Sequence, residues 1–139
     1  MKFMLLVYAD NERLDALPAG AFDASMRDCL AHADALRAEG TLLESQMLEA
    51  APAARSVRAR QGRLTALDGP FAETKEVLAG FNLIEAADMD EAVRIAGGFP
   101  WVHTGCVEVR PVRDIDAVRR TVGAPAAAGA GDRGVGSGA

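Results

Sequence analysis

The chain has 139 residues, of which 50% are hydrophobic and 25% are charged, and its net charge is −5. This length suits one domain, and the acidic balance argues against a nucleic-acid partner, which requires clustered positive charge. No apolar run approaches the roughly 20 residues of a membrane helix, and Met1–Tyr8 lacks the length and cleavage site of a signal peptide. Two cysteines make no disulfide framework. We therefore expect a cytoplasmic protein with no membrane partner.

The first part of the chain predicts a strand, a helix and a second strand. Residues 3–8 form a continuous apolar run, which is typical of a central strand buried on both faces. Apolar residues then recur at helical spacing from Phe22 to Leu36, and Gly40 follows where a helix would end. Residues 41–48 predict the second strand. Strict alternation places four of its side chains on one face: Leu42, Glu44, Gln46 and Leu48.

The rest of the chain predicts a hairpin, two strands and two helices. Gln61-Gly62 is the expected turn of the hairpin formed by residues 56–60 and 63–67. Asp88, with Glu91 three residues later, resembles a capping box at the start of a helix. The remaining expected elements are strands over residues 78–86 and 105–110 and a short peripheral helix over residues 114–122.

This order of elements predicts a ferredoxin-like α+β domain, with two helices on one face of a four-stranded sheet. The open face would mix apolar residues with Glu108, Arg110 and either Gln46 or Ser45. We expect two copies to pair through this face and to enclose a partly polar cavity. The domain is predicted over residues 1–112, with a short extension over 113–122.

Residues 123–139 differ in composition from the rest of the chain. Twelve of these seventeen residues are Gly or Ala. Such a segment buries too little apolar surface to offset its ordering entropy, so we predict a flexible tail.

The segment Asp68-Gly69-Pro70-Phe71-Ala72-Glu73-Thr74-Lys75-Glu76, here called the signature loop, resembles the signature of the YCII-related family in its DGPF-containing branch. Four further segments fit in order: Phe3–Tyr8, Ser56-Val57-Arg58, Gly80–Glu85 and Val107–Val112. The resemblance implies a ferredoxin-like fold that forms a dimeric α/β barrel. It also implies either a small-molecule enzyme of the dehydrochlorinase or isomerase kind, or a regulatory module that acts with an extracytoplasmic-function sigma factor.

One expectation of the family is not reproduced in this sequence. Enzyme-like relatives carry a His on the first helix, paired with an Asp as an acid–base dyad. That position falls near Cys29, and His32 lies about one turn later. The departure weakens the inference of a dehydrochlorinase-type mechanism.

Within the signature loop, Asp68 is a candidate general base, although Asp-Gly-Pro also forms a good turn without any function. Glu73 and Lys75 are candidate positioning residues. Lys75 is one of only two lysines, which favours a need for a compact ammonium, but a solvated Glu–Lys pair would have the same pattern.

The histidines and cysteines leave further alternatives open. His103 is a candidate acid–base residue or a plain loop histidine. Cys29 and His32 have the spacing of a nucleophile pair, but the apolar stripe favours a packed thiol. The spacing matches no zinc site, and no phosphate-binding or dinucleotide motif occurs, so we expect neither metal nor cofactor.

Tyr8 ends the first strand and is a candidate cavity-lining donor. The sequence thus favours a homodimer that binds a small molecule and performs metal-free acid–base chemistry of the lyase or isomerase kind. Asp68 and His103 would be catalytic, and the binding residues would be Tyr8, Gln46, Glu73, Lys75 and Glu108. The alternative is the non-catalytic module associated with a sigma factor.

Overall fold

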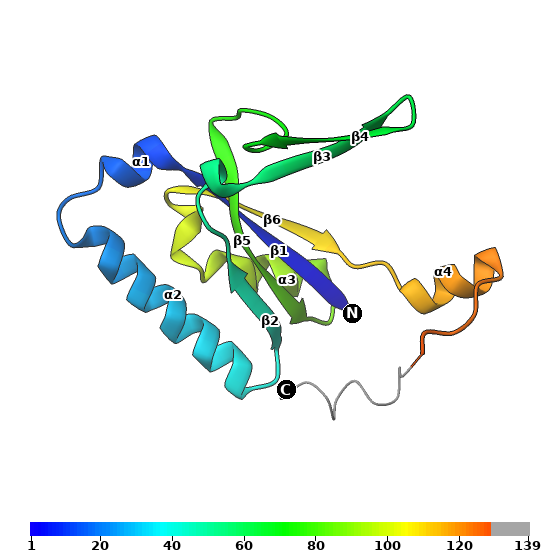
Figure 1. Ribbon diagram of the computed structural model, residues 1–139. Helices are drawn as coiled ribbons and strands as arrows, with labels where there is room; N and C mark the ends of the chain where they lie inside the picture. Colours follow the sequence, from blue (N-terminus) through cyan, green and yellow to red (C-terminus); the bar gives the residue numbers. More distant parts are fainter. Residues whose placement is uncertain (129–139) are drawn as a thin grey trace.

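The computed structural model describes residues 1–128, and Figure 1 shows the arrangement of its elements. The main sheet has the order β2-β5-β1-β6, and all neighbouring strands are antiparallel. Its strands are β1 (Lys2–Asp10), β2 (Leu42–Met47), β5 (Glu76–Glu85) and β6 (Gly105–Pro111). Helices α2 (Ala21–Ala38) and α3 (Met89–Gly97) pack on one face of this sheet. The predicted ferredoxin-like α+β fold is therefore confirmed.

The core lies between the two helices and the sheet. From β1, Phe3 and Leu5 are buried there, and Ile84 of β5 pairs with Phe3 on the same face. Ala33 and Leu36 of α2, together with residues of α3, cover these side chains. Because β1 is central, both of its neighbours satisfy its backbone hydrogen bonds.

The open face of the sheet is mixed, as its sequence indicates. Met4 and Leu6 of β1 pair with Leu83 and Phe81 of β5, and all four side chains are half-buried. On the other side, Leu6 pairs with Glu108 of β6, which is exposed. An apolar centre with a charged edge is therefore left uncovered in one chain.

The predicted faces of β2 are wrong in one respect. A register shift between Leu42 and Glu44 places Leu42 opposite Ile84, and Ser45 opposite Asn82. Since Ile84 and Asn82 share the helix-covered face, Ser45 and not Gln46 points toward α2. The physical reason is a local irregularity that inserts one residue, which reverses the faces of all the residues that follow.

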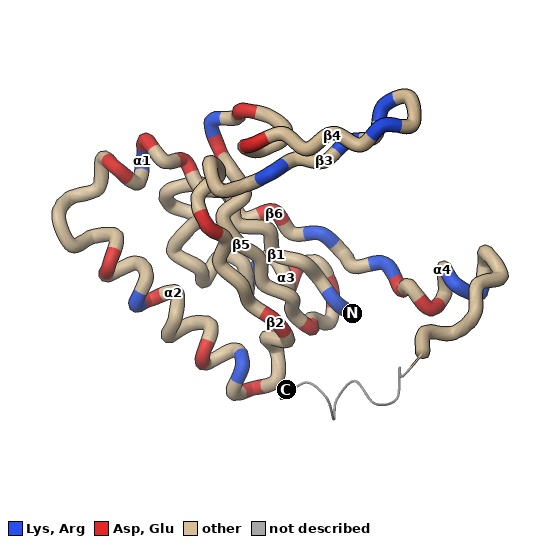
Figure 2. Tube along the Cα trace, in the orientation of Figure 1, with Lys and Arg blue, Asp and Glu red and all other residues tan. Residues whose placement is uncertain are grey.

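The predicted hairpin is confirmed as β3 (Arg55–Arg60) and β4 (Arg63–Asp68), which form a separate two-stranded sheet. Its turn residues Gln61 and Gly62 have φ values of 52° and 78°, as a tight hairpin turn requires. The hairpin projects from the body of the molecule (Figure 1). Figure 2 shows basic residues at its tip, where Arg58, Arg60 and Arg63 share one face.

Smaller elements complete the chain. The structure contains a short helix that the sequence analysis did not predict, α1 (Asn11–Asp15), in which buried Asp10 caps the first turn. Single-turn helices η1 (Ala51–Ala53) and η2 (Pro100–Val102) lie in the connections. The predicted peripheral helix is present as α4 (Ile115–Val122). Within residues 1–128, no helix combines the length and the apolar character needed to cross a membrane.

The tail prediction for residues 123–139 falls largely outside the described residues.

Candidate ligand cavity

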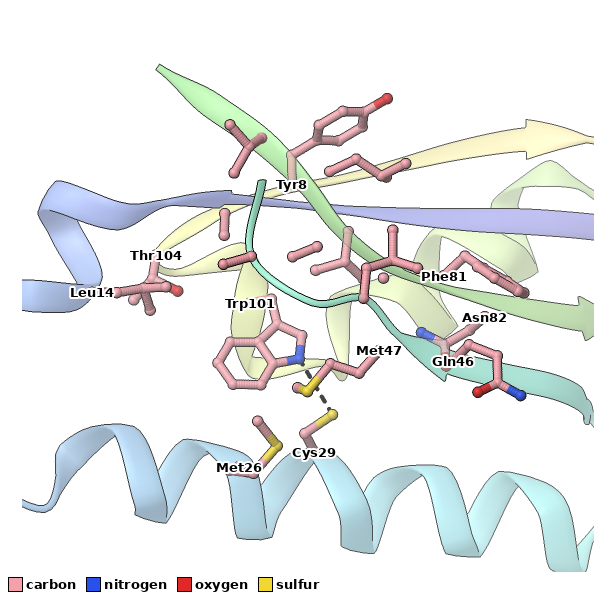
Figure 3. Close-up of a pocket in the computed structure, with 18 of the residues that line it drawn as sticks. Tyr8, Leu14, Met26, Cys29, Gln46, Met47, Phe81, Asn82, Trp101 and Thr104 are labelled. Atoms are coloured by element: carbon pink, nitrogen blue, oxygen red, sulfur yellow. Dashed lines mark hydrogen bonds between the residues drawn. The ribbon is translucent and has the colours of Figure 1, made fainter. Parts of the chain in front are cut away.

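An open cavity of about 450 Å³ lies between the first half of α2 and the helix-covered face of the sheet (Figure 3). Its floor is formed by residues of β1 and β5, and one side by residues 45–51, which continue from β2 toward η1. Trp101 of η2 closes another side. Asn11 and Leu14 of α1 and Thr104 also contribute. The lining from α2 is mostly apolar: Phe22, Met26, Cys29, Leu30 and Ala33.

The cavity exists because only part of the apolar stripe of α2 packs into the core, while another part lines the cavity. Its second half, with Ala33 and Leu36, packs into the core. Phe22 and Leu30, earlier on the same stripe, remain 40% and 56% exposed. A surface helix normally buries its whole stripe. The part of the stripe before Ala33 therefore faces a space that its side chains fill only in part.

A glycine brings the backbone close together at the sheet side of the cavity. A Cβ atom at Gly80 would lie 2.7 Å from the backbone oxygen of Gln46. No side chain therefore projects from Gly80, which lines the cavity together with Ala79. These small residues leave the space that α2 does not fill.

The indole of Trp101 donates a hydrogen bond from Nε1 to Sγ of Cys29, at 3.2 Å. Burial raises the pKa of the Cys29 thiol, and the hydrogen bond from Trp101 offsets part of this increase. At neutral pH the cavity therefore presents a protonated thiol, which is a weak nucleophile.

His32 makes its contacts away from the cavity, on α3. Its Nε2 lies 3.3 Å from the backbone oxygen of Ile95. Its ring packs edge to face against the ring of Phe99, with 4.6 Å between the ring centroids. Cys29, by contrast, lines the cavity. Cys29 and His32 therefore do not form a pair, because the two side chains leave α2 in different directions and make separate contacts.

A buried polar pair lies at the β2 side of the cavity. Ser45 Oγ donates to Oδ1 of Asn82 at 2.6 Å, and Asn82 is only 6% exposed. Asn82 is not among the site residues predicted from the sequence. The available signal was an Asn on the same strand face as Ile84, where an apolar residue would be expected.

Two of the predicted site residues, Tyr8 and Gln46, line this cavity. The Tyr8 hydroxyl is directed away from α2 (Figure 3) and donates to Oε1 of Glu108 at 3.4 Å. The side chain of Gln46 is directed to the open face, where its Nε2 donates to Glu44. Tyr8 and Glu108 are thus brought together, on the open face of the sheet.

The other predicted residues lie outside this cavity. Asp68 ends β4 with an 89% exposed side chain that pairs with Nε of Arg55 at 3.2 Å. His103 follows η2 and is exposed, and Glu73 is exposed in the signature loop. These three residues line neither this cavity nor the second cavity, which lies beneath the signature loop. Their catalytic and binding roles stay predictions.

Lys75 has a structural partner that the sequence did not reveal. Its Nζ lies 3.8 Å from Oδ2 of Asp10, whose other oxygen accepts from the backbone N–H groups of Glu12 and Arg13. The Asp10 side chain is 3% exposed and the Lys75 side chain 74% exposed. The buried carboxylate therefore joins the signature loop to the start of α1.

A second cavity of about 600 Å³ lies beneath the signature loop. Pro70, Phe71 and Thr74 of the loop line it, opposite residues of β5. Residues 48–51 line both cavities, as does Tyr8. Among residues 1–128, no three His, Cys, Asp or Glu side chains are grouped so that they could hold a metal ion.

Comparison with known proteins identifies a family that matches this chain. Residues 1–116 match the family model of the YCII-related domain. An uncharacterised protein of Rhizobium meliloti (strain 1021) is 36% identical over 114 residues, which are 81% of this chain and 92% of that protein.

Among solved structures, the chain is similar to the 5-chloro-2-hydroxyhydroquinone dehydrochlorinase from Burkholderia phenoliruptrix AC1100, in complex with 2,5-dihydroxybenzoquinone. The TM-score is 0.42 at 14% identity, over 81% of this chain and 94% of that one. The family match extends from β1 through β6 and so includes every strand of the main sheet. The chain therefore belongs to the YCII-related family.

Proposed function

We propose that this protein binds a small, largely apolar molecule in the cavity between α2 and the sheet. The observation that carries the proposal is the unburied part of the α2 stripe, which faces a space of about 450 Å³. Protein interiors are close-packed, so a space of this size is not an ordinary packing defect. Its volume, apolar lining and few polar groups are those of small-molecule sites.

Trp101 provides the test, because it is the only tryptophan of the chain and lines the cavity. A library of small neutral compounds is screened by the intrinsic fluorescence of the protein. We expect binders to shift or quench the emission with saturation at a one-to-one ratio. If no compound of the size of one or two rings produced a saturable change, the proposal would be wrong.

A variant that fills the cavity distinguishes binding there from binding elsewhere. Cys29→Phe places a ring in the space beside Trp101, and Val93→Phe places the same ring on the exposed side of α3 as a matched control. Ligand-observed NMR then measures binding without the tryptophan signal. We expect Cys29→Phe to lose binding and Val93→Phe to keep it.

Acid–base activity is the finer part of the proposal, and it would need no metal. Tyr8 and Glu108 support it, since the tyrosine hydroxyl and a carboxylate lie 3.4 Å apart on the open face of the sheet, and Tyr8 also lines the cavity. Asp68 and His103 line neither cavity, so ligand binding does not depend on them. We expect Asp68→Ala and His103→Ala to leave the ligand dissociation constant unchanged within about twofold, as measured by fluorescence titration.

Two further points belong to the proposal. We propose that the working unit is a homodimer that pairs through the open face, because Met4, Leu6, Phe81 and Leu83 are uncovered there in one chain.

The signature loop supports placement in the DGPF-containing branch of the family. The comparisons give no support to a sigma-factor partner, and the proposed function does not include one.

A further inference from the structure

The side chain of Asn82 carries a hydrogen-bond donor that faces the cavity. Asn82 is 94% buried, at 6% exposure, and lines the cavity (Figure 3). Its Oδ1 accepts from Ser45, while no residue among 1–128 accepts a hydrogen bond from its Nδ2. The amide nitrogen keeps access to the solvent in the cavity, so water occupies this donor until a ligand with an acceptor atom displaces it.

Ser45 engages the oxygen end of the Asn82 amide. Its hydroxyl donates to the amide oxygen at 2.6 Å, and the register shift in β2 places it directly opposite Asn82. With the oxygen engaged, the NH2 group is the part available to a ligand. The site is therefore built to meet an acceptor oxygen and not a donor.

The charges around the cavity further restrict the class of ligand that it can bind. Within residues 1–128, no Lys or Arg lines the cavity, and the one acidic lining residue is Glu49. The thiol of Cys29 is protonated at neutral pH because burial raises its pKa. An anion would find no cation there and would lose its hydration, which disfavours charged ligands.

We propose that Asn82 donates from Nδ2 to the carbonyl oxygen of a neutral ligand with an apolar ring, and that Asn82 thereby selects ketones and related carbonyl compounds over hydrocarbons. This inference rests on the proposed small-molecule function and assigns the ligand class. The rings of Phe22 and Trp101, whose centroids lie 5.9 Å apart, and the sulfur of Met26 supply apolar contacts for the rest of the molecule.

The test uses 1-tetralone and its parent hydrocarbon, tetralin, as probes that differ mainly in one carbonyl oxygen. The single indole N–H resonance of Trp101 in a ¹H–¹⁵N spectrum of the full chain reports occupation of the cavity. We expect the wild-type protein to bind tetralone about 2- to 10-fold more tightly than tetralin, as one buried hydrogen bond provides.

Asn82→Leu keeps the branched shape and the number of side-chain heavy atoms and removes the donor. We expect this variant to bind tetralin as wild type does and to lose its preference for tetralone. Ser45→Ala is the second variant, because it leaves Asn82 in place and releases the amide, and it should reduce the preference. Gln61→Glu, in the exposed hairpin turn, is the control for loss of an amide. It should leave the affinity for both probes unchanged.

The outcomes separate this inference from the proposed function. If neither probe binds wild type, the proposed function fails. If both bind wild type equally, or if Asn82→Leu keeps the wild-type preference, the role of Asn82 is wrong while cavity binding stands. Should circular dichroism show that Asn82→Leu is unfolded, Ser45→Ala decides, and an unchanged preference in that variant overturns the inference.

Discussion

Single side chains determine how α2 is held against the rest of the fold. His32 contacts the backbone oxygen of Ile95 in α3 and the ring of Phe99, which follows that helix. The close approach also requires Gly98, where a Cβ atom would lie 2.5 Å from His32 Nε2. Since His32 is one helical turn from Cys29, this contact helps to set the position of α2 above the cavity.

Gly98→Ala is therefore expected to destabilise the protein by about 1–3 kcal/mol, because the added methyl group overpacks the His32 contact. Gly98 has a φ of −78°, so backbone strain does not contribute. Gly97→Ala is the matched control, since within residues 1–128 nothing beyond its chain neighbours and its own helix backbone lies within 4 Å of its Cβ position. Urea unfolding measures both. Equal effects of the two variants would contradict the role given to His32.

The Cys29 thiol provides a pH-dependent prediction at the same scale. Burial raises its pKa in the folded state, so less thiolate is present at a given pH than in the unfolded chain. We expect iodoacetamide to modify Cys29 more slowly in the native protein than in urea, with a reactivity midpoint at higher pH. The same shift stabilises the fold below the unfolded pKa, and this contribution is lost as pH rises through the folded pKa.

Peptide mass spectrometry measures this reaction at Cys29 separately from Cys106. A cavity ligand should slow it further. A native rate equal to the rate in urea would mean that the thiol is not held against Trp101 as described.

At the scale of elements, helix ends are specified by short-range sequence signals. Asp88 caps α3 and accepts from the backbone N–H of Glu91 at 2.9 Å, as the capping pattern predicts. Asp114 caps α4 in a similar way, by accepting from Asp116 and Ala117. The two helices differ in burial, because α3 buries Ala92 and Ala96 whereas α4 has no buried residue.

This difference predicts unequal effects of the same substitution. Asp88→Ala should lower the free energy of unfolding by about 1 kcal/mol, which is the usual contribution of an N-cap. Asp114→Ala should change it by less than about 0.5 kcal/mol, because loosening a peripheral helix exposes no core. Thermal unfolding followed by circular dichroism measures both. A larger loss in Asp114→Ala would show that α4 is packed against something, such as a second copy of the chain.

At the scale of the whole molecule, the open face of the sheet and the projecting hairpin are both incompletely covered. An isolated two-stranded hairpin is at best marginally stable in water. Here β3 and β4 expose Val57 and Leu64 on one face, at 66% and 79%. These features fit the proposed dimer, in which a second chain would cover the apolar centre of the sheet.

Light scattering tests the dimer directly. We expect a mass of twice the 14.6 kDa chain for the wild-type protein. Leu6→Glu, in the centre of the open face, should give the monomer mass, because a buried carboxylate without a partner is strongly unfavourable. Val93→Glu, on the exposed side of α3, is the control and should stay dimeric. A monomeric wild type would contradict the proposal.

The sequence by itself determined the elements and their order. Residues 3–8, the Gln61-Gly62 turn and the Asp88 cap lie within the observed elements or at their ends, because periodicity, turn chemistry and capping act over a few residues. The order of these elements was then sufficient for the ferredoxin-like sheet, since right-handed connections leave few alternatives.

Only the tertiary structure decided the candidate site. The irregularity near Leu43 reverses the faces of β2 and brings Ser45 to Asn82, which strict alternation assigns differently. The cavity itself depends on the distance between α2 and the sheet, which is set by side-chain volumes at positions far apart in sequence, such as Gly80 and Trp101. Local patterns predict which residues form an element, but the space between two elements depends on how both of them pack.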